Sequence, residues 1–184
     1  MDVREIVLEN GEKFAVPRCI QRIDGTSTHG WQVRYQGTKM FSDHTQDGSG
    51  PRQALEMAVR ELLKRIATLP APVTLQHSPS ANKTSDLPPG ISGPIIRPGR
   101  RSKTRTAAFS VLLPQFGKIP RCATVYIGSE STYTAQRYDD ALSKALALRS
   151  RAEVKYRAAA TRARRKEALQ IRAVLGKATT NNDA

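Results

Sequence analysis

The sequence predicts an α+β protein of two small units, each a three-stranded antiparallel sheet packed on one helix, with a long basic C-terminal helix. A repeated pattern is the first ground for this prediction. Three strand-like segments precede one amphipathic helical segment over residues 17–69, and the same succession recurs over residues 90–149. The second ground is the intervening stretch 70–89, whose Pro, Ser, Ala and Thr content is typical of a semi-stiff inter-domain linker.

The first unit is predicted to span residues 1–69 and to begin with a hairpin over residues 3–17. The pair Asn10-Gly11 suits the positive φ angles of a tight turn. Apolar and polar residues then alternate so that Trp31 and Val33 share one face, which favours a core position for Trp31 over a stacking platform for bases. The strands of this sheet are expected at residues 20–23, 31–35 and 39–41.

A helix is predicted to complete the first unit. Pro51 suits its first turn, where a missing backbone N–H has no cost, and Leu69-Pro70 ends it. One face carries apolar residues at helical spacing, namely Leu55, Ala58, Val59, Leu62, Leu63 and Ile66.

The second unit is predicted over residues 90–149. Ser131 or Thr132 is the expected N-cap of its helix. No Gly or Pro interrupts residues 132–175, so this segment allows either one long helix or two, with Gly176 as a candidate C-terminal cap. The strands are expected within residues 90–97, 108–113 and 122–127, and the apolar face of the helix is expected to comprise Tyr138, Ala141, Leu142, Ala145, Leu146 and Leu148.

Residues 150–177 are predicted to form a basic helical extension, and residues 178–184 a disordered tail. Residues 150–175 hold 8 basic residues and 2 acids, with alanine at most positions where a core stripe would lie. Such a segment buries little apolar surface by itself, so we expect it to be solvated. A basic arm on phosphates is favoured over a coiled-coil seam, because the stripe is too rich in alanine.

Positive charge is concentrated in the second half of the chain. The 184 residues carry a formal net charge of +14, of which residues 1–69 contribute +1 and residues 70–184 contribute +13. Residues 97–121 hold 7 basic residues and no acidic one. Such a charge favours a polyanionic partner and, less often, an anionic membrane surface.

The sequence gives little ground for an enzyme, a metal site or a membrane protein. Asp43-His44 is a suggestive pair, but it lacks the remaining groups of a nucleophile, base and orienter set. Cys19 and Cys122 form no Cys-x-x-Cys pair and the 3 histidines are scattered, so we expect no metal and no other cofactor. The sequence has neither a signal-peptide pattern nor an apolar run of membrane-spanning length, and we expect a cytoplasmic, nucleoid-associated protein.

One part of the second unit has a recognisable order of residues. Residues 125–128 are Val-Tyr-Ile-Gly, and residues 133–141 are Tyr-Thr-Ala-Gln-Arg-Tyr-Asp-Asp-Ala. This order resembles the DNA-binding domain of plant ethylene-response (Apetala-type) factors, which also has bacterial, phage and homing-endonuclease versions. In that family the third strand ends in an aromatic-aliphatic-Gly motif, and the helix carries an Ala-Tyr-Asp-x-Ala signature. The opening residues 90–93 are similar to the family's first strand, whereas the first unit, whose helix lacks the Tyr-Asp pair, matches only in outline.

The resemblance implies that the exposed face of the second sheet lies in the major groove of DNA, with the helix behind the sheet. It implies groove-facing positions for Thr124 and Tyr126 on the third strand, and for Ser110 and Leu112 on the second. Leu112 departs from the family pattern, in which a charged residue is common there. Arg97 matches a family position that often contacts DNA. In the first unit the corresponding positions are Gln21 or Arg22, then Gln32, Arg34 and Gln36, then Lys39.

The side chains at these positions also suit DNA when the family resemblance is set aside. Arg can pair with the O6 and N7 atoms of guanine, and Gln can pair with adenine. Lys and Arg in turns bind phosphates and set the register of a protein on the duplex. The basic residues expected on phosphates are Arg100, Arg101, Lys103, Arg105, Lys118 and Arg121.

We therefore expect a non-catalytic double-stranded DNA-binding protein, a bacterial or phage transcriptional regulator. Two alternatives stay open. One is an RNA-binding module, because a basic sheet with a helix also suits duplex RNA. The other is a protein-interaction factor, such as a phage-encoded inhibitor, in which the first unit docks on a host protein. The sequence leaves the oligomeric state open.

Overall fold

The structure is a computed structural model that describes residues 2–43, 50–76, 78–79, 81–98 and 104–180, with side chains described as far as Arg172. The chain divides into two compact units, Met1–Pro72 with Ala160–Ala184, called unit 1 here, and Val73–Ala159, called unit 2. The predicted α+β class is confirmed: two three-stranded antiparallel sheets each pack on a helix, and a two-stranded sheet accompanies the first.

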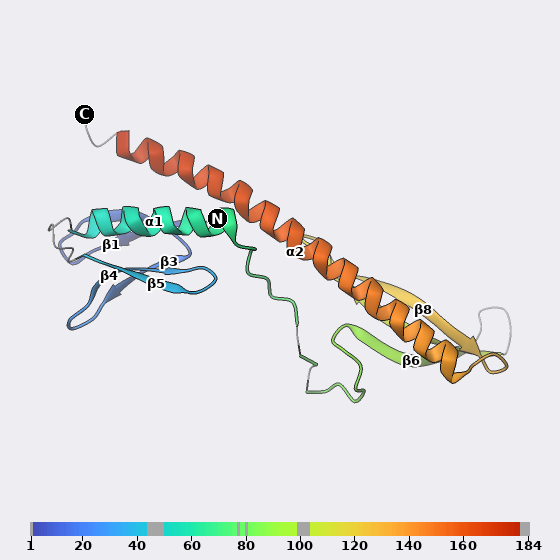
Figure 1. Ribbon diagram of the computed structural model, residues 1–184. Coiled ribbons are helices and arrows are strands. Elements are labelled where there is room, and N and C mark those ends of the chain that lie inside the picture. The colour runs from blue at the N-terminus through green and yellow to red at the C-terminus, as the bar shows by residue number, and fades with distance from the viewer. Residues whose placement is uncertain (1, 44–49, 77, 80, 99–103, 181–184) are drawn as a thin grey trace. The chain divides into compact units, whose positions relative to one another are not determined.

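Unit 1 contains five strands and one complete helix. β1 (Val3–Val7) and β2 (Lys13–Pro17) pair as the predicted hairpin. β3 (Ile20–Asp24), β4 (His29–Arg34) and β5 (Thr38–Ser42) form an antiparallel sheet in that order. α1 (Gly50–Thr68) lies along one face of this sheet (Figure 1).

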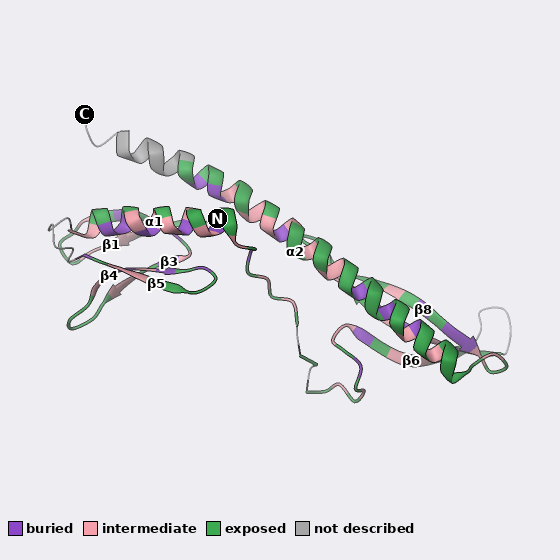
Figure 2. Cartoon of the chain, viewed as in Figure 1, coloured by how far each residue is buried: buried purple, intermediate pink, exposed green. Residues whose placement is uncertain are grey.

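The core of unit 1 forms between the β3–β5 sheet and α1. Trp31 and Val33 are fully buried, which confirms the core position predicted for Trp31. The indole Nε1 of Trp31 donates a hydrogen bond of 2.8 Å to the carbonyl oxygen of Pro51, so burial leaves no unpaired donor on this ring. The buried residues of α1 lie at helical spacing, as predicted, and are Ala54, Leu55, Ala58, Leu62 and Ile66 (Figure 2).

Unit 2 contains the second three-stranded sheet. β6 (Ile91–Pro98), β7 (Arg105–Leu113) and β8 (Arg121–Ser129) are antiparallel and pair in that order. The helix α2 (Ala135–Thr180) packs on this sheet by its first part (Figure 1). Between Pro70 and Pro89 the described residues form neither helix nor strand.

Two sequence-based expectations about the ends of α2 are wrong. Its N-cap is Thr134, whose hydroxyl oxygen accepts a hydrogen bond of 3.2 Å from the backbone N–H of Arg137. The hydroxyl of Thr132 instead accepts a bond of 2.8 Å from the N–H of Ser129, and so closes the turn before the helix. The helix passes through Gly176 to Thr180 without a break, which resolves the choice between one helix and two.

The apolar stripe of α2 in unit 2 differs from the prediction at one end. Ala141 and Ala145 are buried against the sheet, but Leu146 and Leu148 are 40% and 37% exposed. The next position at helical spacing belongs to Arg149, which is 8% exposed. Its guanidinium donates to the carbonyl oxygen of Leu112 and lies 2.7 Å from a carboxylate oxygen of Glu153. The buried stripe therefore ends at Arg149, whose charge is paired with Glu153, and does not continue through Leu146 and Leu148 as predicted.

The basic second part of α2 is less solvated than the sequence suggests. Ala160, Ala168 and Ile171 are buried, and Ala168 belongs to the core cluster of unit 1. Small side chains allow the helix backbone to approach its neighbours closely, so an alanine-rich face can still pack. The basic residues around these positions are mostly exposed. None of the described helices is long and apolar enough to cross a membrane.

Gly128 has a steric role at the point where β8 gives way to the turn before α2. It is buried, and a Cβ added there would lie 2.9 Å from the Cα of Tyr133 and 3.1 Å from the carbonyl carbon of Thr132. The backbone of this turn leaves no room for a side chain at residue 128. The glycine of the Val-Tyr-Ile-Gly segment is thus required by the fold of unit 2.

Replacing Gly128 by Ala should lower the free energy of unfolding by about 1–3 kcal/mol, because the backbone must move to accept the added methyl group. Urea denaturation followed by circular dichroism measures the change. Gly25→Ala is the control, because its Cβ would meet only the carbonyl oxygen of Thr28, at 3.5 Å. Equal stability of the Gly128→Ala variant and the wild type would show that this close approach is not a constraint.

Candidate nucleic-acid interface

The exposed face of the β6–β8 sheet presents uncharged residues in rows. Paired residues on neighbouring strands share a face, and the register aligns Ser92, Ser110 and Thr124 in one row. The adjacent row joins Ala108 to Tyr126, which is 56% exposed. Hydroxyl groups therefore make up much of the polar chemistry of this face.

The sides of the strands agree with those implied by the resemblance. Phe109, Val111 and Ile127 are buried on the helix side, with Val125 at 9% exposure beside them. Leu112 is 41% exposed on the opposite face. Alternation along β7 and β8 thus leaves Ser110, Leu112, Thr124 and Tyr126 on the face away from α2, and their contact with DNA stays a prediction.

The basic residues of this sheet lie at its two ends. Arg97 and Arg105 stand near the ends of β6 and β7 that meet at the β6–β7 connection, and both are exposed. Lys118 and Arg121 are exposed at the other end of β7 and β8. Arg105 has an acidic neighbour, with 3.9 Å between its Nε and a carboxylate oxygen of Glu130.

Three of the predicted phosphate contacts, Arg100, Arg101 and Lys103, fall outside the described residues. In the sequence they fall between β6 and β7. Between Asp86 and Glu130 the sequence has no acidic residue. The exposed face of β6–β8 and its connections therefore carry no opposing charge of their own.

The exposed face of the β3–β5 sheet carries amides and one arginine. Gln21 and Gln32 are paired across β3 and β4, and Arg34 follows on the same side of β4. The Nε of Arg34 donates to the side-chain oxygen of Gln32 at 2.5 Å, so these two groups form one polar cluster. Gln36 is exposed beyond β4, and its amide nitrogen donates to the carbonyl oxygen of Pro70 at 3.2 Å.

Two residues predicted for this face, Arg22 and Lys39, lie on the helix side of the sheet. Arg22 is paired with Trp31, and its guanidinium carbon lies 5.1 Å from the centre of the indole ring. Lys39 is paired with Val33, and its Nζ lies 3.7 Å from a carboxylate oxygen of Glu61 on α1. The expected face was wrong because the apolar residues of β3 at positions 20 and 23 do not fix the phase of the strand.

Arg22 has a structural role between two carboxylates. Its Nη2 lies 2.7 Å from Asp24 and 2.6 Å from Asp43, and its side chain is 11% exposed. Burial lowers the pKa of the guanidinium, but hydrogen bonds to both carboxylates outweigh it and raise the pKa. The hydrogen bond from Arg22 lowers the pKa of the Asp24 carboxyl. The stabilisation that corresponds to the lowered pKa of Asp24 is fully present at neutral pH, and it is lost as the pH falls below about 4, the ordinary carboxyl value, and through the lowered pKa.

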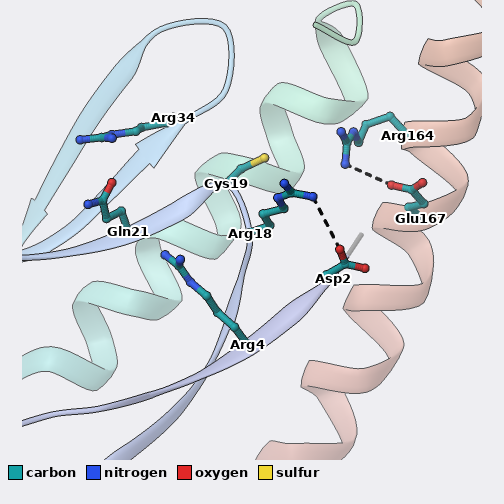
Figure 3. Close-up of a pocket in the computed structure, with 8 residues that line it drawn as sticks. All are labelled: Asp2, Arg4, Arg18, Cys19, Gln21, Arg34, Arg164 and Glu167. Carbon is teal, nitrogen blue, oxygen red and sulfur yellow. Dashed lines mark hydrogen bonds and ion pairs between the residues drawn. The ribbon is translucent and has the colours of Figure 1, made fainter. Parts of the chain in front are cut away.

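A pocket in unit 1 gathers arginines that lie far apart in the sequence. It has a volume of about 540 Å³. Figure 3 shows its lining residues, which come from β1 and the residue before it, the β2–β3 connection, β3, β4 and α2. They are Asp2, Arg4, Arg18, Cys19, Gln21, Arg34, Arg164 and Glu167. Because the four arginines belong to separate segments, no local sequence pattern signals their meeting.

Comparisons with family models, with curated proteins and with solved structures each found no match to this chain. The similarity of residues 125–141 to the Apetala-type domain therefore stays a prediction that rests on those residues. Within the described part of the chain, no group of three or more His, Cys, Asp or Glu side chains is placed to hold a metal ion.

Replacing Arg22 by Ala should lower the free energy of unfolding by about 3 kcal/mol, because it leaves the carboxylate of Asp43, 7% exposed, without its partner. Arg34→Ala is a matched control on the exposed face of the same sheet and should change stability by less than about 0.5 kcal/mol. Urea denaturation at neutral pH measures both changes. If the two variants lose equal stability, the structural role assigned to Arg22 is wrong.

Proposed function

We propose that this protein binds double-stranded DNA without catalysis, as a bacterial or phage transcriptional regulator. The observation that carries the proposal is the exposed face of β6–β8, which combines a row of hydroxyl groups with basic residues at both ends, where Glu130 beside Arg105 is the one acid near them among the described residues. A face of this kind matches the two parts of a DNA groove, with base edges on its floor and phosphates along its rims.

The side chains of the face suit contact with base edges. Ser and Thr hydroxyls both donate and accept hydrogen bonds, and the methyl group of Thr can contact the methyl group of thymine. Thr124 lies beside Ser110, and Tyr126 is the largest exposed group nearby. Hydroxyls accept several base patterns, so we expect moderate sequence preference from this face.

The basic residues supply the affinity in this proposal. Arg97, Arg105, Lys118 and Arg121 lie at the ends of the strands, and the predicted contacts Arg100, Arg101 and Lys103 lie in the β6–β7 connection. The exposed basic residues of α2 extend the charge. Each neutralised phosphate releases counterions, so affinity should fall steeply as salt rises.

Duplex RNA is the nearest competing partner. Among the described residues of the β6–β8 face, Tyr126 is the one aromatic side chain, whereas proteins that bind single-stranded RNA on a sheet use several for base stacking. Competition between duplex DNA and duplex RNA of the same sequence tests the proposal. If duplex RNA displaces the bound DNA more effectively than duplex DNA does, RNA binding replaces DNA binding as the favoured function.

A protein partner is the other competing explanation for this protein's function. Residues 1–69 have a net charge of only +1, which is compatible with docking of this segment on a host protein. If this protein still captures a protein partner after nuclease treatment, and if it does not bind duplex DNA, the data would favour a protein-interaction factor over a DNA-binding protein.

Charge reversal of Arg100, Arg101 and Lys103 to Glu should weaken binding to all duplex sequences to a similar extent. The slope of log affinity against log salt should fall by about 0.9 for each phosphate that the variant no longer neutralises. Fluorescence anisotropy with labelled duplexes at several salt concentrations measures both quantities. An unchanged affinity and slope would refute the footprint assigned to the β6–β7 connection.

Replacing Thr124 by Val should reduce the preference among duplex sequences while leaving the salt slope unchanged, because it removes a hydroxyl and no charge. The loss at a preferred site should be about 1–3 kcal/mol if the hydroxyl contacts a base. Thr106→Val is a control, since Thr106 lies on the same face of β7 but near the end of the sheet. Equal effects of the two changes on sequence preference would contradict groove contact by Thr124.

A further inference from the structure

The arginine pocket of unit 1 has a local excess of positive charge that the composition of the region does not predict. Four arginines and two acids line it, so its formal net charge is +2. Three of these arginines belong to residues 1–69, whose whole net charge is only +1. The fold has thus brought cations from distant positions into one pocket, which points to an anionic ligand.

The contacts of the four guanidinium groups leave donors available. Arg4 donates from Nη2 to the carbonyl oxygen of Ile20 at 3.1 Å, and Arg164 donates from Nη1 to Glu167 at 3.1 Å. Arg18 has its nearest carboxylate oxygen, on Asp2, at 3.7 Å. Arg34 donates from Nε to the side-chain oxygen of Gln32 at 2.5 Å. Each guanidinium has five N–H donors, and these contacts occupy only part of them. Asp2 and Glu167 therefore orient Arg18 and Arg164 but leave some of their N–H donors available for a ligand.

The pocket has a suitable size and place for a phosphate that belongs to a larger molecule. Its volume of about 540 Å³ exceeds that of a bare phosphate and leaves room for an attached sugar. Gln21 and Arg34 line the pocket and also lie on the exposed face of the β3–β5 sheet. A strand of nucleic acid crossing that face would pass Gln21 and Arg34 at the edge of the pocket and could place a backbone phosphate there.

We propose that Arg4, Arg18, Arg34 and Arg164 form a binding site for a phosphate ester, and that this ester is a backbone phosphate of the bound DNA. Planar guanidinium groups bind phosphate oxygens in pairs of parallel hydrogen bonds, which a set of arginines from several directions can provide. The site makes unit 1 a second contact with DNA. The DNA backbone as the source of the ester rests on the proposed function, whereas the phosphate chemistry of the pocket does not.

Neutral substitutions at the pocket test this inference on the full-length protein. Arg4→Gln and Arg164→Gln should each weaken duplex DNA binding by about tenfold or more, the effect of losing a charge-assisted hydrogen bond. The double variant should lower the salt slope by about 0.9 in total, because both arginines hold one phosphate. Arg60→Gln is the matched control, since it removes the same charge from an 80% exposed side chain on α1. It should change the affinity by less than about twofold, the effect of one exposed charge.

Alkylation of Cys19 provides a readout that needs no mutation. Cys19 lines the pocket, whereas Cys122 lies on β8 in unit 2, and mass spectrometry of peptides resolves the two free thiols. Duplex DNA should slow alkylation of both cysteines. A nucleoside monophosphate should slow alkylation of Cys19 alone, in a saturable way.

The outcomes separate the pocket from the proposed function. If the wild type binds duplex DNA and the pocket variants match Arg60→Gln, the phosphate site is wrong and DNA binding by unit 2 stands. If the monophosphate protects Cys19 but duplex DNA does not bind, the pocket is a phosphate site and the DNA assignment is wrong. If neither ligand slows alkylation of Cys19, the phosphate site is overturned.

Discussion

Each three-stranded sheet in this protein can bury only one of its faces, and the rest of the structure depends on that constraint. An isolated sheet of this size is unstable in water unless a helix or another sheet covers a face. α1 covers one face of β3–β5 and the first part of α2 covers one face of β6–β8. The opposite faces expose side chains such as Gln21 and Arg34 in unit 1 and Leu112 and Tyr126 in unit 2, and the proposed function assigns DNA contact to these faces.

The two exposed faces differ in the polar groups that they present. The β6–β8 face holds hydroxyls between strand ends that carry basic residues, while the β3–β5 face holds amides beside an arginine pocket. Acids pair with arginines in both units, as Asp24 and Asp43 do with Arg22 and as Glu153 does with Arg149. Paired charges stabilise the fold, whereas charges without acidic neighbours remain available to a polyanion.

Much of the fold could be predicted from the sequence because short-range patterns determine it. The eight strands and two helices of the described residues lie close to the predicted segments, since alternation in β4 and β7 and the stripe of α1 are unambiguous. The side of Arg22 could not be predicted, because it depends on pairing with Trp31 across two strands. The place of Arg149 was missed because a buried arginine is recognised only through its partners, and the arginine pocket unites residues as distant as Arg4 and Arg164.

Selection of duplexes from a randomised DNA pool at near-physiological salt, followed by sequencing, tests the central claim most directly. The account predicts that the full-length protein retains duplexes and enriches a motif, because hydroxyls and amides on the exposed sheet faces contact base edges while arginines hold phosphates. If duplexes are retained but no sequence motif is enriched, the phosphate contacts stand and the proposed recognition of bases is wrong. If no duplex is retained, the account of these two faces as a DNA-binding surface is contradicted.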